Sequence, residues 1–121
     1  MKSLKIALLQ LLPCHTLQQN LEKGIAACKK AKEMGADIAL FPEMWSVGYS
    51  IPDDIPLLKS TAISSDSEFV NIFGRLAKEL NMAIGIAYLE QFEPLPRNIS
   101  LAPFSRKISS ACGKPIVITV T

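Results

Sequence analysis

The residue best placed to do chemistry is Glu43, a carboxylate that directly follows an apolar run. Residues 36–41 read ADIALF between Gly35 and Pro42, which predicts a short buried strand that cannot continue past the proline. Open α/β sheets bind ligands beyond the carboxyl ends of their strands, where Glu43 stands. Partial burial there suits a carboxylate to accept a proton, so we predict a general base. The alternative is a carboxylate that only caps or solvates the following loop.

The elements before this run predict a strand, a crossover helix and a parallel strand. Residues 4–12 (LKIALLQLL) are apolar at nearly every position, which is typical of a central strand covered on both faces. Residues 16–19 (TLQQ) match a capping box, and the helix that it begins is expected to end near Gly35. Because the strand at 36–41 follows almost at once, the crossover should be right-handed.

The elements after Glu43 extend this pattern. Residues 44–65 have no regular period and predict a long ordered loop. A second capping box at 65–68 (SDSE) begins a helix that ends at Asn81, and 82–89 (MAIGIAYL) predict another buried strand. The fold class is therefore α/β, in the order strand, helix, strand, loop, helix, strand. Residues 93–98 read as a turn-rich connector, and the helices predicted leave one face of the sheet bare.

The charge and the cysteine content of the sequence limit the kinds of partner and the cellular compartment that we expect. The 13 basic and 11 acidic residues give a net charge of +2 and are dispersed along the chain, so no nucleic-acid or anionic-membrane partner is predicted. No stretch approaches the roughly 18 apolar residues of a membrane span. The three cysteines show no C-x-x-C pair, which favours free thiols in a reducing, cytoplasmic setting over disulfides or a zinc site.

Several stretches together resemble the N-terminal part of the nitrilase, or carbon-nitrogen hydrolase, superfamily. They are KIALLQLLP (5–13), NLEKGIAACKKAKEMGADIALFPEMWSVGY (20–49), FVNIFGRLAKELNMAIGIAYLE (69–90) and EPLPRN (93–98). The resemblance covers residues 4 to about 98 and includes the family's F-P-E motif at 41–43. It implies a partial α-β-β-α sandwich whose C-terminal half is missing, and it divides the chain into 1–98, part of a hydrolase domain, and 99–121, a divergent tail.

The resemblance also implies a mechanism. Members of this family use a Glu, Lys and Cys triad to hydrolyse small amides or nitriles, need no metal or organic cofactor, and usually form homo-oligomers. The F-P-E glutamate falls on Glu43 as the general base. Tyr49 falls where the family lines its substrate pocket, with core packing as the alternative role.

The other two members of the triad have only candidates in the tail. The segment FSRK ending at Lys107 is similar to the family's lysine segment, with an exposed tail lysine as the alternative. Cys112 is the candidate nucleophile, although it lies only five positions beyond Lys107, whereas the family separates these residues by a substantial segment. Cys28 falls on the apolar face of the first helix, and His15 is expected at the surface beside Cys14.

Two hypotheses follow. Either the chain belongs to an amide- or nitrile-hydrolysing enzyme and retains its glutamate, or it is a truncated, non-catalytic form that folds poorly or docks on a full-length partner. A flavodoxin-like or Rossmann binding module ranks below both, because no glycine-rich phosphate loop follows the first strand.

Overall fold

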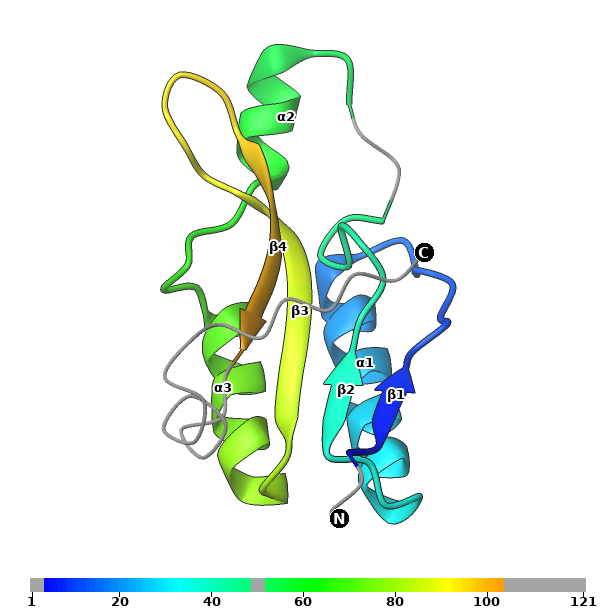
Figure 1. Cartoon of the computed structure of the whole chain (residues 1–121). Helices are drawn as coiled ribbons and strands as arrows, with labels where there is room; N and C mark the ends of the chain where they lie inside the picture. Colours follow the sequence, from blue (N-terminus) through cyan, green and yellow to red (C-terminus); the bar gives the residue numbers. More distant parts are fainter. Residues whose placement is uncertain (1–3, 49–51, 104–121) are drawn as a thin grey trace.

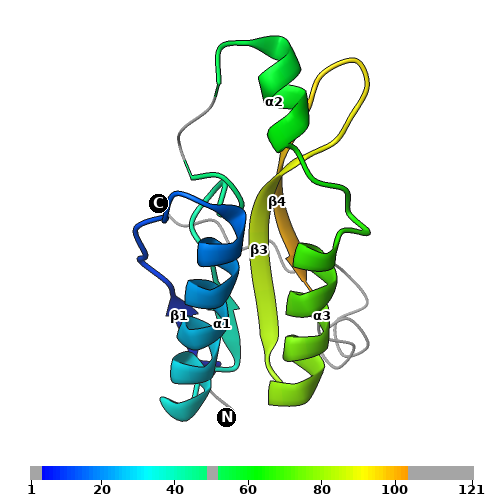
Figure 2. The ribbon, with the colours of Figure 1, turned by 180° about the vertical axis from the view of Figure 1, so that it is seen from behind.

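A single four-stranded sheet organises the chain in the computed structural model, which describes residues 4–48 and 52–103. The elements are β1 (Ile6–Leu8), α1 (Leu17–Glu33), β2 (Ile38–Leu40), α2 (Ile55–Thr61), α3 (Glu68–Leu80), β3 (Ala83–Glu90) and β4 (Arg97–Pro103). The strand order is β1-β2-β3-β4; the first three strands are parallel and β4 is antiparallel to β3. Helices α1 and α3 cover the same face of the sheet (Figure 1 and Figure 2). The predicted α/β class, a partial nitrilase-like sandwich, is confirmed.

Helix α1 begins and ends where its sequence predicts. The Thr16 hydroxyl oxygen accepts a hydrogen bond from the Gln19 N–H at 3.1 Å, which satisfies one of the free donors of the first turn. At the other end the Met34 N–H donates to the Lys30 carbonyl, and Gly35 leaves the helix with a φ of +86°. Its inward face carries five buried residues: Asn20, Leu21, Gly24, Cys28 and Ala31.

Helix α3 begins two residues later than its capping box predicts. Ser67, not Ser65, is the N-cap, and its side chain accepts from the Val70 N–H at 3.4 Å. Both serines offer the same hydroxyl, but residues 64–67 form a turn closed by a 3.0 Å hydrogen bond from the Ser67 N–H to the Ser64 carbonyl. The helix therefore starts only after this turn. It ends at Asn81, as predicted, and Asn81 itself takes the left-handed conformation.

Aromatic rings fill the space between the two helices and the sheet. Phe73 of α3 is fully buried, and its ring meets Phe41 and Phe69 edge-on at centroid distances of 5.1 and 5.2 Å. Phe41 also packs against Trp45 at 5.4 Å. Gly24 lets α1 approach these rings, since a Cβ there would lie 2.8 Å from Phe73, 2.9 Å from Phe41 and 3.0 Å from the Trp45 nitrogen. Phe41 and Trp45 flank Pro42 and Glu43, so the core supports the candidate base on both sides.

The close approach at Gly24 gives a test. Gly24→Ala should lower the free energy of unfolding by about 1 kcal/mol. Overpacking destabilises the folded state by about 1–3 kcal/mol, and the higher helix propensity of alanine offsets about 1 kcal/mol of this loss. Urea denaturation followed by circular dichroism measures the change. Ala26→Gly, at an exposed position of the same helix, calibrates the propensity difference. A Gly24→Ala variant more stable than the wild type would contradict the packing described.

Three details differ from the sequence expectation. Within the described residues β1 is an edge strand, and its Ile6 and Leu8 remain 38% and 51% exposed, because only β2 pairs with it and the helices cover only one face. The predicted loop 44–65 contains helix α2, which Asp54 caps by accepting from the Leu57 N–H at 3.1 Å. The connector predicted at 93–98 ends earlier than expected, because β4 begins at Arg97 and includes position 98.

Candidate active site at Glu43

Glu43 lies just beyond the carboxyl end of β2, as predicted. Backbone pairing with β3 extends to Phe41, whose N–H donates to the Gly85 carbonyl at 2.9 Å, and residues 43–48 then form turns. The Glu43 side chain is exposed, so the expectation of partial burial is wrong. The cause is that the turn sends its apolar residues inward and leaves the carboxylate on the outside. An exposed carboxylate is open to an incoming substrate or nucleophile.

Met44 sets the direction of the chain directly after Glu43. Its φ of +54° lies in the left-handed region, which is uncommon for a residue with a side chain. Met44 is 4% exposed, and its side chain packs with Ala62 and Leu89. The main-chain carbonyl of Met44 accepts hydrogen bonds from the Val47 and Gly48 N–H groups. Burial of the side chain thus holds a strained backbone, a feature that clusters at functional sites.

Strand β3 anchors the turn from one side. The Trp45 N–H donates to the Ala87 carbonyl at 2.8 Å, and the Ser46 hydroxyl oxygen accepts from the Leu89 N–H at 3.2 Å. Trp45 and Ser46 are each 1% exposed. The backbone that carries Glu43 is therefore fixed to the sheet although its side chain reaches solvent.

Helix α1 anchors the turn from the other side, through Asn20. The Trp45 indole N–H donates to the Asn20 carbonyl at 3.1 Å, and the Asn20 side-chain amide donates to the Ser46 carbonyl at 3.4 Å. Sequence reasoning missed Asn20. The available signal was its place on the apolar stripe of α1, four residues before Gly24 and eight before Cys28, where a polar residue needs a partner.

The structure does not describe the other predicted site residues. Tyr49, Lys107 and Cys112 lie outside the described residues. His15 is exposed, as expected. Within 4–48 and 52–103, no group of three or more His, Cys, Asp or Glu side chains is arranged to hold a metal ion, and no helix is long and apolar enough to cross a membrane.

Cys28 is a core residue, as predicted, and not a nucleophile. Its side chain is fully buried, and desolvation raises the pKa of the thiol from 9.0 to about 12. The reactive thiolate is thereby disfavoured. Cys14, a free and half-buried cysteine, lies in the segment between β1 and α1.

The raised pKa of Cys28 predicts a pH dependence of stability. Between pH 9 and 12 the unfolded chain loses this proton while the folded chain keeps it, so the free energy of unfolding falls as pH rises. Relative to Cys28→Ala, the wild type should lose up to about 1.4 kcal/mol per pH unit in this window. Urea denaturation of both proteins from pH 8 to 10.5 measures it, and parallel curves would contradict the desolvated thiol.

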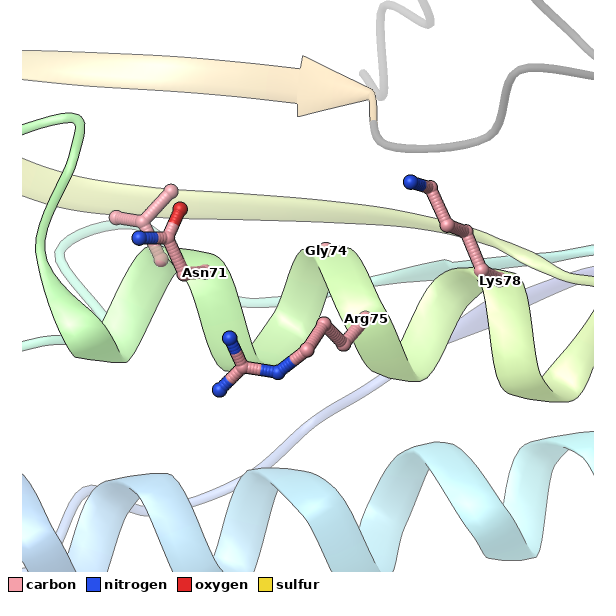
Figure 3. Close-up of a pocket in the computed structure, with 5 residues that line it drawn as sticks. Asn71, Gly74, Arg75 and Lys78 are labelled. Atoms are coloured by element: carbon pink, nitrogen blue, oxygen red, sulfur yellow. The ribbon is translucent and has the colours of Figure 1, made fainter.

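A pocket of about 280 Å³ lies along α3, away from the residues that carry the candidate base. It is lined by Val70, Asn71, Gly74, Arg75 and Lys78. Figure 3 shows the long side chains diverging along the helix rather than converging on one point. Arg75 pairs with Glu68 at 3.3 Å, and the Asn71 amide donates to the Asp66 carbonyl at 3.0 Å. These contacts stabilise the start of α3 and assign no chemistry to the pocket.

Comparison with known protein families shows the family to which the region around Glu43 belongs. The family model described as carbon-nitrogen hydrolase matches residues 5–98, which include β1 to β3 and the whole Glu43 turn. The chain belongs to the carbon-nitrogen hydrolase family. Within this family region, the turn after β2 presents the glutamate on a backbone tied to two neighbouring elements.

Proteins that are similar to this chain in sequence or structure include much longer ones. A glutamine-dependent NAD(+) synthetase of Thermotoga maritima is 28% identical over 94 residues, which are 77% of this chain and 16% of that protein. The structure of the glutamine-dependent NAD+ synthetase from Acinetobacter baumannii, in complex with ADP, superimposes with a TM-score of 0.62 at 25% identity, over 87% of this chain and 19% of that one.

An amidase from a Nesterenkonia species shares the fold. It superimposes with a TM-score of 0.53 at 22% identity and covers 75% of this chain and 34% of the amidase. This chain thus spans about a sixth to a third of the length of these proteins.

Proposed function

We propose that this chain supplies the general base, Glu43, of an enzyme that hydrolyses the carbon–nitrogen bond of a small amide. One observation carries the proposal: Glu43 is exposed just beyond the end of β2, on a turn with a fixed backbone. The turn is fixed because its buried residues Trp45 and Ser46 form hydrogen bonds to α1 and β3. A base must reach its proton in a fixed geometry, and this turn supplies a fixed backbone with an open carboxylate.

The reaction proceeds in two stages. Glu43 takes the proton of a cysteine thiol, and the thiolate attacks the amide carbon to give a tetrahedral oxyanion, which a lysine ammonium and a backbone N–H stabilise. The carbon–nitrogen bond breaks, the nitrogen leaves as ammonia with the proton returned by Glu43, and a thioester remains. Glu43 then takes a proton from water, whose attack releases the carboxylic acid and the thiol.

Lys107 and Cys112 are the candidates for the lysine and the thiol, and Tyr49 is the candidate for the pocket wall. Amides rank before nitriles because the sequence relative at 28% identity and the structural relative at 25% identity are both named as glutamine-dependent. The side-chain amide of glutamine is therefore the first substrate to test. We also propose that the enzyme acts as a homo-oligomer in the cytoplasm.

A second candidate function is a non-catalytic form that docks on a longer partner. The apolar side chains of the first strand region favour it, since Leu4, Ile6, Leu8 and Leu12 are 56%, 38%, 51% and 80% exposed. Clusters of exposed apolar side chains mark interaction surfaces or aggregation-prone faces. This form would bind a hydrophobic dye and turn over nothing.

Ammonia release by the purified 121-residue chain separates the two candidates. L-Glutamine, simple aliphatic amides and simple nitriles are offered in turn, and ammonia is measured by a coupled dehydrogenase assay. Release from an amide in proportion to protein concentration is expected. A folded, monodisperse preparation that releases no ammonia from any of them overturns the proposed function in favour of the non-catalytic form.

A further inference from the structure

We propose that Asn20 is a positioning residue for Glu43: its side-chain amide fixes the turn that presents the carboxylate. This inference rests on the proposed function of Glu43. Among residues 4–48 and 52–96, the buried polar residues are Asn20 and its partner Ser46. Asn20 is 1% exposed, and its hydrogen bonds go to Cys14, Ser46, Trp45 and the helix backbone rather than to Glu43.

Three separate hydrogen bonds converge on Asn20. Its side-chain oxygen accepts from the Cys14 N–H at 2.6 Å, which holds the segment leading out of β1. Its side-chain nitrogen donates to the Ser46 carbonyl at 3.4 Å, and its own carbonyl accepts from the Trp45 indole at 3.1 Å. One residue of α1 thus joins the chain before the helix to the turn that follows Glu43.

Only a side-chain amide fits both neighbours. The Cys14 N–H requires an acceptor and the Ser46 carbonyl requires a donor, and asparagine offers both on one short side chain. Aspartate keeps the acceptor but sets a second oxygen against the Ser46 carbonyl, and an apolar residue leaves both backbone groups without a partner in the core. Aspartate is also nearly isosteric, so it disturbs packing least.

The consequence for Glu43 follows from the short connection. Only Met44 separates Glu43 from Trp45, and Met44 already holds a strained left-handed backbone. When the Asn20 amide no longer donates to Ser46, the turn loses one of its two hydrogen bonds to α1 and keeps only the bond from the Trp45 indole to the Asn20 main-chain carbonyl, so the strained residue can relax. The carboxylate then moves relative to the sheet, and a displacement of about 1 Å is enough to cost about 100-fold in rate.

The first arm of the test needs no activity. Trp45 is the chain's only tryptophan, so its indole N–H gives one signal in a ¹H–¹⁵N spectrum. Asn20→Asp should shift this signal and the amide signals of residues 44–48, while those of α3 keep their wild-type positions. The control is Asn71→Ala, which removes an asparagine amide that donates to the exposed backbone at Asp66. Unchanged signals from 44–48 in Asn20→Asp would overturn the proposal.

A measurement on the wild type covers the case in which Asn20→Asp does not fold. The two side-chain amide protons of Asn20 should exchange with solvent far more slowly than those of Asn71, because Asn20 is buried and Asn71 is exposed. Equal exchange rates would show that the Asn20 amide is not held in the turn, and would overturn the proposal as well.

The second arm is kinetic and uses a double-mutant comparison. Asn20→Asp should lower kcat for amide hydrolysis at least about tenfold with KM changed less than about threefold, and should have less than about a twofold effect when Glu43 is already glutamine. An equal loss in both backgrounds would mean that Asn20 does not act through Glu43. If Glu43→Gln alone leaves turnover intact, the proposed base fails, while the spectroscopic arm still decides the positioning role.

Discussion

Replacement of Glu43 by glutamine is expected to lower the rate of amide hydrolysis by about 10²- to 10⁴-fold, the usual contribution of a positioned general base. Glutamine has nearly the same shape but cannot take the proton of the thiol or of the attacking water. Both chemical stages use this proton transfer, so kcat and kcat/KM should fall together. The measurement is ammonia release from the best amide substrate at saturating and at low concentration.

Glu33→Gln is the matched control for this exchange. Glu33 is also an exposed glutamate, near the end of α1, and its carboxylate lies 3.9 Å from the Lys30 ammonium, a surface pair of little energetic weight. Its replacement should leave turnover within about twofold, since it lies in no turn that follows a strand end. If both variants keep full activity, Glu43 is not the base, and the carboxylate only solvates the start of its turn.

Phe73→Ala is expected to lower the free energy of unfolding by about 3–5 kcal/mol, the usual cost of emptying a buried aromatic site. Phe73 is fully buried, and its ring contacts Phe41 and Phe69. Its removal opens a cavity at the point where α1, α3 and the sheet meet. For a domain of this size such a loss is a large fraction of the total stability. Urea denaturation followed by circular dichroism measures it.

Two further variants show whether the loss comes from the cavity. Phe73→Leu retains part of the buried volume and should cost clearly less than Phe73→Ala. Leu12→Ala removes an apolar side chain that is 80% exposed and should change stability by no more than about 0.5 kcal/mol. A Phe73→Ala variant as stable as Leu12→Ala would contradict the aromatic core between the helices.

Local signals in the sequence were sufficient for most element boundaries. The Thr16 cap and the helix end at Asn81 are set by groups within a few residues of each other, and the structure has both. The apolar run at 82–89 is nearly continuous because β3 is buried on both faces, and it forms the strand that its pattern predicts. The family resemblance came from several stretches between residue 4 and about 98, among them the F-P-E sequence that ends at Glu43, and the family model matches residues 5–98.

The tertiary structure alone decided how these elements serve Glu43. The partners that hold its turn are distant in sequence: Asn20 and Trp45 are 25 residues apart, and Ser46 and Leu89 are 43 apart. Neither hydrophobic periodicity nor a capping motif can predict such long-range pairs, because both patterns involve residues within one or two helical turns of each other. The exposure of Glu43, the left-handed Met44 and the edge position of β1 in the described sheet are likewise set by what packs beside them. The sequence by itself determined which residue is the base candidate, and long-range packing determined how that residue is held.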